Sequence, residues 1–476
     1  MTGPVRDTVE PDVDVLVLGS GIAGGCAALA ARDRGADVLV LEPADVLGGH
    51  ARLSTGFFMA SASRLHEAAG VEDPPERLLR DYLNLNRQAV STDAVRTFAE
   101  TSGATVDWLV GHGVRFHDRP LRGGNATVSR SLVAEGFGAG LMERLWSAAT
   151  GAGVQVAPRH RALELITDDG CVVGCRVATP DGEQRIRARS VVLATGGFEA
   201  DPELLAAHYP SSGLVGDWLW NIGHEHNRGD GLRLARGVGA RLVGHDHGLR
   251  VMHANFVRTL EATLPGWLVL VDAAARRYVD ETSQYGMVAR RTDEVGGRAW
   301  AILDARAIDR PDDDPTWDYA QQVPGIAERR SVNFSAAMLT EQRDAGRVAV
   351  ADTIEELAAA VGLPTVQLAA TVRQYNHGAR TGRDAHGKQP EFLRPIDRPP
   401  YLAVEMRPAS LVYTAYGPAI DGDGRVLNEL GDPIPGLFAA GEVAGGVLGE
   451  LYVGSGSGLG TAGTLGRAAG LAAAGR

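Results

Sequence analysis

The sequence predicts an α/β fold, in which a Rossmann-like nucleotide-binding domain is built from both ends of the chain and a smaller α+β cap domain is inserted between them. Three observations predict this architecture. A βαβ pattern opens the chain, a stretch of different character follows from about residue 241, and β-like, Gly-rich segments return after residue 399. The 476 residues also exceed what one ordinary hydrophobic core supports.

The βαβ pattern occupies residues 13–42. Residues 13–18 and 36–41 are short apolar runs, which are typical of buried strands. The turn GSGIAG at residues 19–24 and an Ala-rich helix that ends at Gly35 lie between them. A parallel pair of strands joined by a helix is therefore expected at the start of the sheet.

The turn at residues 19–24 matches the pattern G-x-G-x-x-G. The first glycine permits a tight turn, the second lets the backbone approach a pyrophosphate, and the third packs the helix on the strand. The helix N-terminus faces the phosphates, and the carboxylate that ends the second strand accepts hydrogen bonds from ribose hydroxyls. The pattern predicts a dinucleotide but does not separate NAD from FAD. The expected contacts are Gly19, Gly21, Ile22, Ala23, Gly24 and Glu42.

The remaining elements are predicted from periodicity and turn residues. Helices are expected over residues 93–112, 131–152, 353–361 and 364–375. Strands are expected over residues 154–156, 162–167, 172–178, 184–188 and 190–194. A Gly-rich stretch, residues 441–466, leads into the last helix. We expect residues 11–240 to form the first part of the nucleotide-binding domain, 241–398 the cap, and 399–476 the second part.

Composition and charge exclude several classes of function. A net charge of −12 argues against nucleic acid as the main partner. Cys26, Cys171 and Cys175 form neither a metal-binding nor a disulfide pattern, so we predict no metal site and expect a reducing cytoplasm. The first ten residues are polar and predict a loose tail rather than a signal peptide, and no apolar run reaches the length of a membrane span.

Several short segments resemble the flavoprotein family of fumarate reductase, succinate dehydrogenase and 3-ketosteroid dehydrogenase. They are residues 48–50 with 54–56, 194–198, 229–231 and 436–442, and their order and spacing over residues 13–470 make the resemblance specific. The resemblance implies that the nucleotide is FAD. Because no second G-x-G-x-x-G unit supplies an NAD(P) site, we expect a separate electron acceptor. The FAD contacts implied by the resemblance are Gly49, His50, Ser54, Gly56, Thr195, Gly196, Gly197, Asp230, Glu442, Ser457 and Leu459.

His50 stands where succinate dehydrogenases have the histidine that bonds covalently to the flavin. The resemblance therefore leaves two interpretations, a covalent 8α-histidyl bond and a hydrogen bond to the cofactor. The hydrogen bond is favoured, because the Arg-Ser-His-Thr context of the covalent enzymes is absent and the sequence here is Gly48-Gly49-His50-Ala51.

The resemblance also locates the chemistry. Fumarate reductases hold and protonate their substrate with an Arg, a His and a second Arg, and Tyr285, Leu448 and Tyr452 occupy those three slots here. A dicarboxylate needs fixed positive charge and forked donors. The replacements therefore argue against fumarate reduction.

The same replacements are similar to those of 3-ketosteroid dehydrogenases and related cyclic-ketone desaturases. By that resemblance, the Tyr452 hydroxyl and the Gly456 N–H face the ketone oxygen and stabilise enolate character. Tyr285 takes a proton as general base, and the flavin accepts a hydride. The steroid enzymes use a second tyrosine beside the base, for which Tyr82 and Tyr416 are candidates. The prediction is a flavin-dependent desaturase that acts next to the carbonyl of a cyclic ketone.

Two other functions stay open. Val453 replaces a family Pro, and residues 452–459 also resemble a segment of tricarballylate dehydrogenases. A carboxylic-acid substrate would then need arginines from elsewhere, for which Arg250, Arg258 and Arg290 are available. The chain could also bind flavin without turnover, although tyrosines at both catalytic slots argue against this. The sequence leaves the substrate, the direction of the reaction, the electron acceptor and the oligomeric state undecided.

Overall fold

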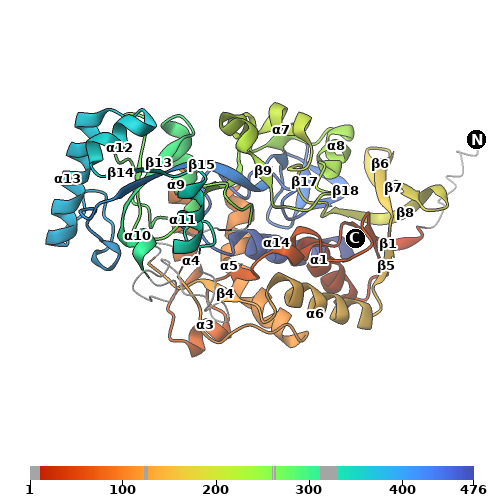
Figure 1. Cartoon of the computed structure of the whole chain (residues 1–476). Coiled ribbons are helices and arrows are strands. Elements are labelled where there is room, and N and C mark those ends of the chain that lie inside the picture. The colour runs from red at the N-terminus through yellow and green to blue at the C-terminus, as the bar shows by residue number, and fades with distance from the viewer. Residues whose placement is uncertain (1–10, 123–126, 260, 262–263, 311–330, 476) are drawn as a thin grey trace, which may run out of the picture.

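A computed structural model describes residues 11–122, 127–259, 261, 264–310 and 331–475 of the chain. The first ten residues, for which the sequence predicts a loose tail, lie outside the described residues. Two parts are visible in Figure 1, with helices α12 (Ile354–Val361) and α13 (Thr365–Thr381) at one end and strands β6 (Arg161–Asp168) and β7 (Cys171–Thr179) at the other. Within the described ranges, no helix combines the length and the apolar character that crossing a membrane requires.

The larger part is built on a sheet whose central strands come from distant parts of the chain. Strand β1 (Val13–Leu18) pairs in parallel with β2 (Val38–Glu42) on one side and with β8 (Gly182–Leu193) on the other. Strand β18 (Pro433–Ala439) then pairs in parallel with β8. The predicted α/β fold, with a nucleotide-binding domain made from both ends, is therefore confirmed. The sheet also contains β5 (Gln155–Pro158), β6, β7 and β17 (Arg425–Leu427).

Strand β8 differs from the prediction. The sequence predicts two strands, over residues 184–188 and 190–194, but the structure has one strand of 12 residues. Its first half pairs antiparallel with β7 and its second half pairs in parallel with β1 and β18. One continuous strand pairs with neighbours on both sides, so the predicted break between residues 188 and 190 is wrong.

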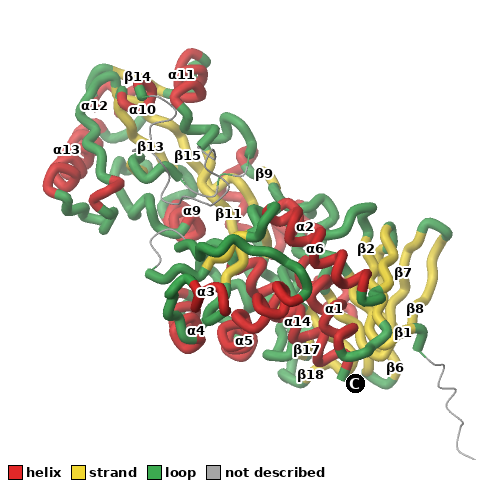
Figure 2. Tube along the Cα trace, turned by 90° about the horizontal axis from the view of Figure 1, so that it is seen from below, coloured by secondary structure: helices red, strands yellow, loops and turns green. Residues whose placement is uncertain are grey.

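Helices α1 (Ile22–Asp33) and α14 (Ser457–Ala474) lie side by side against this sheet (Figure 2). The prediction that residues 441–466 form one Gly-rich stretch before the last helix is wrong, because the helix already begins at Ser457. A Cβ added at Gly466 would lie 2.4 Å from the Ala23 carbonyl oxygen, and one at Gly470 would lie 2.1 Å from that of Ala27. These glycines therefore let the two helix backbones touch.

The predicted helix over residues 131–152 begins later than expected. Strand β4 (Ser131–Val133) pairs with β3 (Phe57–Met59), and helix α6 (Phe137–Gly151) follows a turn at Gly136, which has a φ of +75°. The other helices of this part are α2 (Gly49–Leu53), α3 (Arg64–Ala68), α4 (Pro75–Leu85), α5 (Thr92–Gly111), α7 (Pro202–His208) and α8 (Asp230–Gly237).

The cap is built on strand β15 (Tyr401–Thr414), which pairs with strands from both sides of the predicted domain boundaries. Its partners are β9 (Trp220–Asn221), β11 (Gly248–His253), β13 (Ala299–Asp304) and β14 (Ala349–Ala351), and β12 (Val269–Val271) pairs with β13. The domain division stays a prediction. Because β15 follows the expected boundary at residue 399, we propose that the cap extends to residue 414.

The segment between β10 and β16 begins and ends side by side. Strand β10 (Leu242–Val243) pairs antiparallel with β16 (Gly417–Pro418), next to the nucleotide-binding part. The remaining cap elements are α9 (Tyr285–Glu294), α10 (Arg306–Asp309), α11 (Ala336–Asp344), α12, α13 and the 3₁₀ helices over residues 210–218 and 390–392.

Candidate functional site

A long cavity follows the carboxyl ends of β1, β2 and β8, which is where ligands bind in open α/β sheets. Its empty volume, counting the space open to solvent at its mouth, is about 1180 Å³. The end near β2 is lined by Glu42, His160 and Arg161, and the other end by Tyr413 and Tyr452. The cavity therefore joins the nucleotide-binding part to the cap strand β15.

The glycine turn at residues 19–24 shapes the near wall of the cavity. A Cβ at Gly19 would lie 2.3 Å from the Ala194 carbonyl oxygen, and one at Gly24 would lie 1.9 Å from that of Gly19. At Gly21, by contrast, no atom lies within 4 Å of an added Cβ. The backbone is therefore open to a ligand at the second glycine. Helix α1 also begins there without an acidic residue in its first turn, which suits a phosphate.

Glu42 is buried at the end of β2 and organises this turn. Its Oε2 accepts hydrogen bonds from the Ser20 N–H at 3.0 Å and from the Ser20 hydroxyl at 2.6 Å, and its Oε1 accepts one from the Ala44 N–H at 2.8 Å. Beside it, Arg161 donates to Asp230 at 2.8 Å. These charged groups are placed for the ribose end of a dinucleotide.

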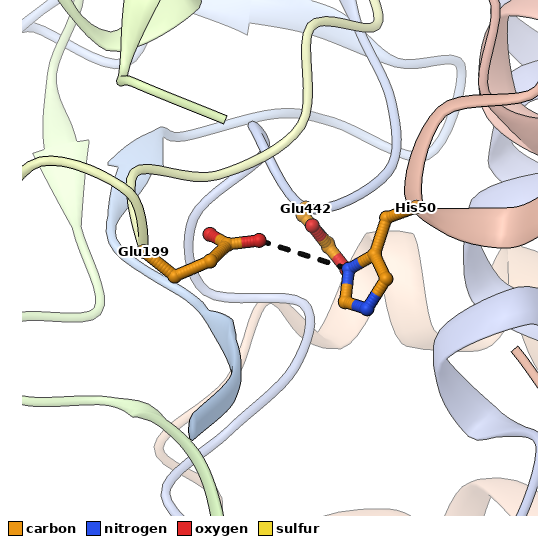
Figure 3. Close-up of side chains that lie close together, drawn as sticks. All are labelled: His50, Glu199 and Glu442. Atoms are coloured by element: carbon orange, nitrogen blue, oxygen red, sulfur yellow. Dashed lines mark hydrogen bonds and ion pairs between the residues drawn. The ribbon is translucent and has the colours of Figure 1, made fainter. Parts of the chain in front are cut away.

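His50, Glu199 and Glu442 lie close together, and His50 and Glu442 line the cavity (Figure 3). The His50 Nδ1 lies 3.1 Å from the Glu442 Oε1 and 3.7 Å from the Glu199 Oε1. Burial disfavours the imidazolium, but the two carboxylates outweigh burial and raise the pKa of His50 to about 9. Burial and the neighbouring Glu442 raise the pKa of Glu199 to about 8.

Three tyrosines form a cluster where the cavity reaches the cap. The ring of Tyr452 lies 5.5 Å from that of Tyr285 and 5.7 Å from that of Tyr413, between centroids. Leu448 belongs to the same cluster. A Cβ at Gly286 would lie 2.9 Å from the Tyr452 Cβ, so this glycine lets α9 approach closely and bring Tyr285 there. The three slots that the sequence comparison singled out therefore meet in space.

The hydroxyl groups of the tyrosine cluster are held in buried surroundings. The Tyr452 hydroxyl accepts a hydrogen bond from the Gly458 N–H at 3.2 Å. Gly456, the predicted partner of Tyr452, precedes α14 and packs against the backbone at Met59. Burial and the neighbouring Tyr452 raise the pKa of Tyr285 well above 10, although a hydrogen bond with Ser455 acts the other way. The structure as it stands therefore does not activate Tyr285 as a base.

The two candidates for a second catalytic tyrosine have partners other than Tyr285. Tyr82 is buried and donates to the Val447 carbonyl at 2.9 Å, and Tyr416 stacks on His208 with a centroid distance of 4.5 Å. Tyr413, on β15, is instead the tyrosine that lines the cavity next to Tyr452.

The structure brings most of the predicted residues to one cavity. Those that line it are Gly19, Gly21, Ile22, Ala23, Glu42, Gly49, His50, Ser54, Thr195, Gly196, Asp230, Glu442, Tyr452 and Leu459. The remaining predicted residues are not among those that line it. They are Gly24, Gly56, Gly197, Tyr285, Gly456 and Ser457.

Sequence reasoning missed several residues of the site. Glu199 lies two residues after the predicted Gly196-Gly197 contact, and Asn227 lies three residues before Asp230, so proximity to these motifs was the one signal available. No sequence signal indicated Tyr413, because its position depends on the pairing of β15 with the cap strands. The remaining missed polar residues are His160, Arg161, His224 and His226.

The comparisons with known proteins agree with this geometry. The family model described as the FAD binding domain matches residues 14–459. A probable fumarate reductase of Shewanella frigidimarina is 30% identical, over 91% of this chain and 70% of that protein. The 3-oxosteroid 1-dehydrogenase of Mycobacterium tuberculosis is 26% identical, over 97% and 98%. A 3-ketosteroid-Δ4-(5α)-dehydrogenase from Rhodococcus jostii, solved with 4-androstene-3,17-dione, has a TM-score of 0.82 and 29% identity, over 98% of each chain.

Proposed function

The chain belongs to the FAD-binding-domain family of flavoprotein oxidoreductases, and we propose that it desaturates a cyclic ketone between the α and β carbons next to the carbonyl. FAD is its cofactor, and members of the family act on small molecules. The proposal that the substrate is a cyclic ketone rests on the tyrosine cluster at the cap end of the cavity.

The cavity residues fit FAD. The open backbone at Gly21 and the N-terminus of α1 suit the pyrophosphate, and Glu42 lies at the ribose end. When bound, FAD supplies a hydride acceptor. The protein's own contribution is to orient the substrate, to stabilise charge on its oxygen and to move a proton.

The observation that carries the proposal is the uncharged character of the catalytic slots. Tyr285, Leu448 and Tyr452 pack together in a cluster with aliphatic neighbours. Of the described residues lining the cavity, Arg161 is the one arginine, and it pairs with Asp230 at the other end. A compact dicarboxylate needs forked cationic donors, so an apolar ketone suits this end better.

The arginines that an acid substrate could use have other partners or are exposed. Arg250 is buried and donates to Asp293 at 2.6 Å, and Arg290 pairs with Glu450 at 2.7 Å. Arg258 is exposed on the cap. These contacts favour a ketone substrate over a carboxylic acid. A carboxylic acid is the alternative substrate, because a fumarate reductase is among the relatives.

In the proposed reaction, the Tyr452 hydroxyl donates to the ketone oxygen together with a backbone N–H of the turn that leads into α14. Family resemblance assigns this donor role to the Gly456 N–H. In the structure, the N–H that donates to the Tyr452 hydroxyl belongs to Gly458. Donors aimed at a developing negative charge are the largest common source of catalysis. Tyr285 removes the proton, and Tyr413 is the tyrosine placed to assist. The electrons then leave to a separate acceptor.

Turnover assays test the substrate class. With an artificial acceptor, the holoenzyme is expected to oxidise a saturated 3-ketosteroid or a substituted cyclohexanone, and to leave succinate unchanged. With reduced viologen it is expected to leave fumarate unchanged, because none of the described residues lining the tyrosine end of the cavity is an arginine. Efficient turnover of fumarate or succinate, without turnover of any ketone, would replace the proposal with the carboxylic-acid alternative.

Acid precipitation tests how FAD is held. We expect free yellow flavin in the supernatant and a protein band without ultraviolet fluorescence, because the Arg-Ser-His-Thr context of the covalent enzymes is absent around His50. A fluorescent band that is lost in His50→Ala would show a covalent histidyl bond instead.

A further inference from the structure

His50 is the second residue of the short helix α2, and one side of its ring faces two carboxylates from distant parts of the chain. Glu442 follows β18 and Glu199 follows β8, and both approach the Nδ1 atom, at 3.1 and 3.7 Å. The Nε2 side of the ring points away from both carboxylates (Figure 3). His50 also lines the cavity, so this second nitrogen is the one available to a ligand.

The two carboxylates are themselves held in place. Asn227 donates to the Glu199 Oε1 at 2.6 Å and lies 3.4 Å from the Glu442 Oε2. Thr414, on the cap strand β15, donates to the Glu199 Oε2 at 3.3 Å and receives the Phe198 N–H at 2.9 Å. Five segments of the chain therefore contribute to one acid–histidine–acid arrangement, which is the geometry that sets the orientation of a ring and the location of its protons.

We propose that Glu442 and Glu199 act as positioning residues that hold His50 as an imidazolium, whose Nε2–H is then directed as a charged donor at bound FAD. The inference rests on FAD binding, which the family establishes, and not on the identity of the substrate. A charge-assisted donor is about twice as strong as a neutral one. A fixed positive charge beside the cofactor also favours the uptake of electrons.

The charges around His50 support this protonation state. One carboxylate opposite Nδ1 suffices to stabilise the imidazolium, and the second can keep its own proton, in line with the raised pKa of Glu199. The other titratable group coupled to His50 is His224, from the loop before α8, whose pKa is lowered by burial. A neutral His224 adds no repulsion. His226, Glu42, Asp230, His160 and Arg161 also line the cavity.

A metal ion is a less suitable occupant of the cluster. His50, Glu199 and Glu442 could each offer one ligand atom. However, the Glu199 Oε1 already accepts a 2.6 Å hydrogen bond from Asn227. An imidazolium has no lone pair for a metal, and metal ligation by histidine requires the neutral ring.

The protonation state can be read by nitrogen NMR of the FAD-loaded protein labelled with ¹⁵N-histidine, with His50→Asn to assign the signal. We expect both ring nitrogens of His50 to stay protonated up to at least pH 8. In Glu442→Gln the transition should fall by about one pH unit or more, which is a tenfold loss of proton affinity. Glu450→Gln, which removes a carboxylate paired with Arg290, is the matched control and should leave the His50 signal unchanged.

A His50 ring that titrates below pH 7 in the wild-type protein would overturn the proposal, whether or not Glu442→Gln folds. The reduction potential of bound FAD gives a second readout that does not depend on substrate. It should be lower in His50→Asn than in wild type at pH 7, because asparagine keeps a donor but not the charge. Equal potentials would overturn the charged role, and a flavin bonded covalently to His50 would overturn the donor role.

Discussion

Replacing Tyr285 with phenylalanine is expected to slow the reduction of bound FAD by the ketone substrate on the order of 10²–10⁴-fold. Tyr285 is the first residue of α9, and its ring lies 5.5 Å from that of Tyr452. Phenylalanine keeps the ring in this cluster and removes the hydroxyl group that takes the proton. Anaerobic stopped-flow mixing measures the rate directly, and FAD content should stay unchanged.

Two further variants separate catalysis from packing. Tyr452→Phe removes a donor to the ketone oxygen and should slow the same step roughly 10²–10³-fold. Tyr416→Phe is the control, because this tyrosine stacks on His208 and does not line the cavity. It should react at the wild-type rate. A wild-type rate in Tyr285→Phe would exclude that residue from the mechanism.

The pH dependence of this step follows from the burial of Tyr285. Since burial and Tyr452 raise its pKa well above 10, the phenolate form is scarce at neutral pH. The rate of flavin reduction should therefore increase with pH without levelling off below pH 10. Ser455, whose hydrogen bond acts against this shift, is one group that can lower the pKa when substrate is bound.

The second large effect is on stability, in the cap. Glu281→Gln should destabilise the cap by about 3–5 kcal/mol, because it leaves two buried cations without their shared carboxylate. The Glu281 Oε2 lies 2.8 Å from the Arg277 Nη2 and 2.8 Å from the Lys388 Nζ. Arg277 also donates to Asp384 at 2.5 Å, and all four side chains are buried. Urea denaturation, followed by tryptophan fluorescence, measures the loss.

An exposed acid provides the matched control for Glu281. Glu294 forms a surface pair with Arg291 three residues earlier on α9, and its removal should cost no more than about 1 kcal/mol. A loss of less than about 1 kcal/mol in Glu281→Gln would show that the buried network does not hold the cap together.

The same network predicts how stability changes with acid. Burial alone would raise the pKa of Glu281, but Lys388 and Arg277 outweigh burial and lower it to about 2. A carboxyl whose pKa is lowered in the folded state stabilises the fold above its unfolded pKa, which is near 4.5. That contribution is lost as the pH falls from about 4.5 to about 2. The wild-type protein should thus lose stability over this range, and Glu281→Gln should lose less.

Local patterns predicted the nucleotide-binding part well. The β1–α1–β2 unit follows from two apolar runs and a glycine turn, and the structure reproduces it within three residues. The prediction failed where contacts between distant segments set the bounds of a helix or strand. β8 is one strand because two different neighbours share it, and α14 starts early because its glycines touch α1.

The candidate site was predictable only in part, for a related reason. The cofactor segments carry glycine motifs, and the slots of Tyr285, Leu448 and Tyr452 follow from family resemblance. The contact of His50 with Glu199 and Glu442 joins residues up to 392 positions apart, and no local pattern reports such a contact. Tyr413 likewise depends on the register of β15 in the cap sheet.

Anaerobic single turnover tests the central claim most directly. The oxidised holoenzyme is mixed without any acceptor with a saturated 3-ketosteroid, and the visible absorbance of the flavin and the mass of the extracted steroid are followed together. The account predicts that the flavin bleaches while the steroid loses two hydrogen atoms and gains a double bond next to its carbonyl. Flavin that stays oxidised with every cyclic ketone, yet is bleached by a carboxylic acid such as succinate, would contradict it.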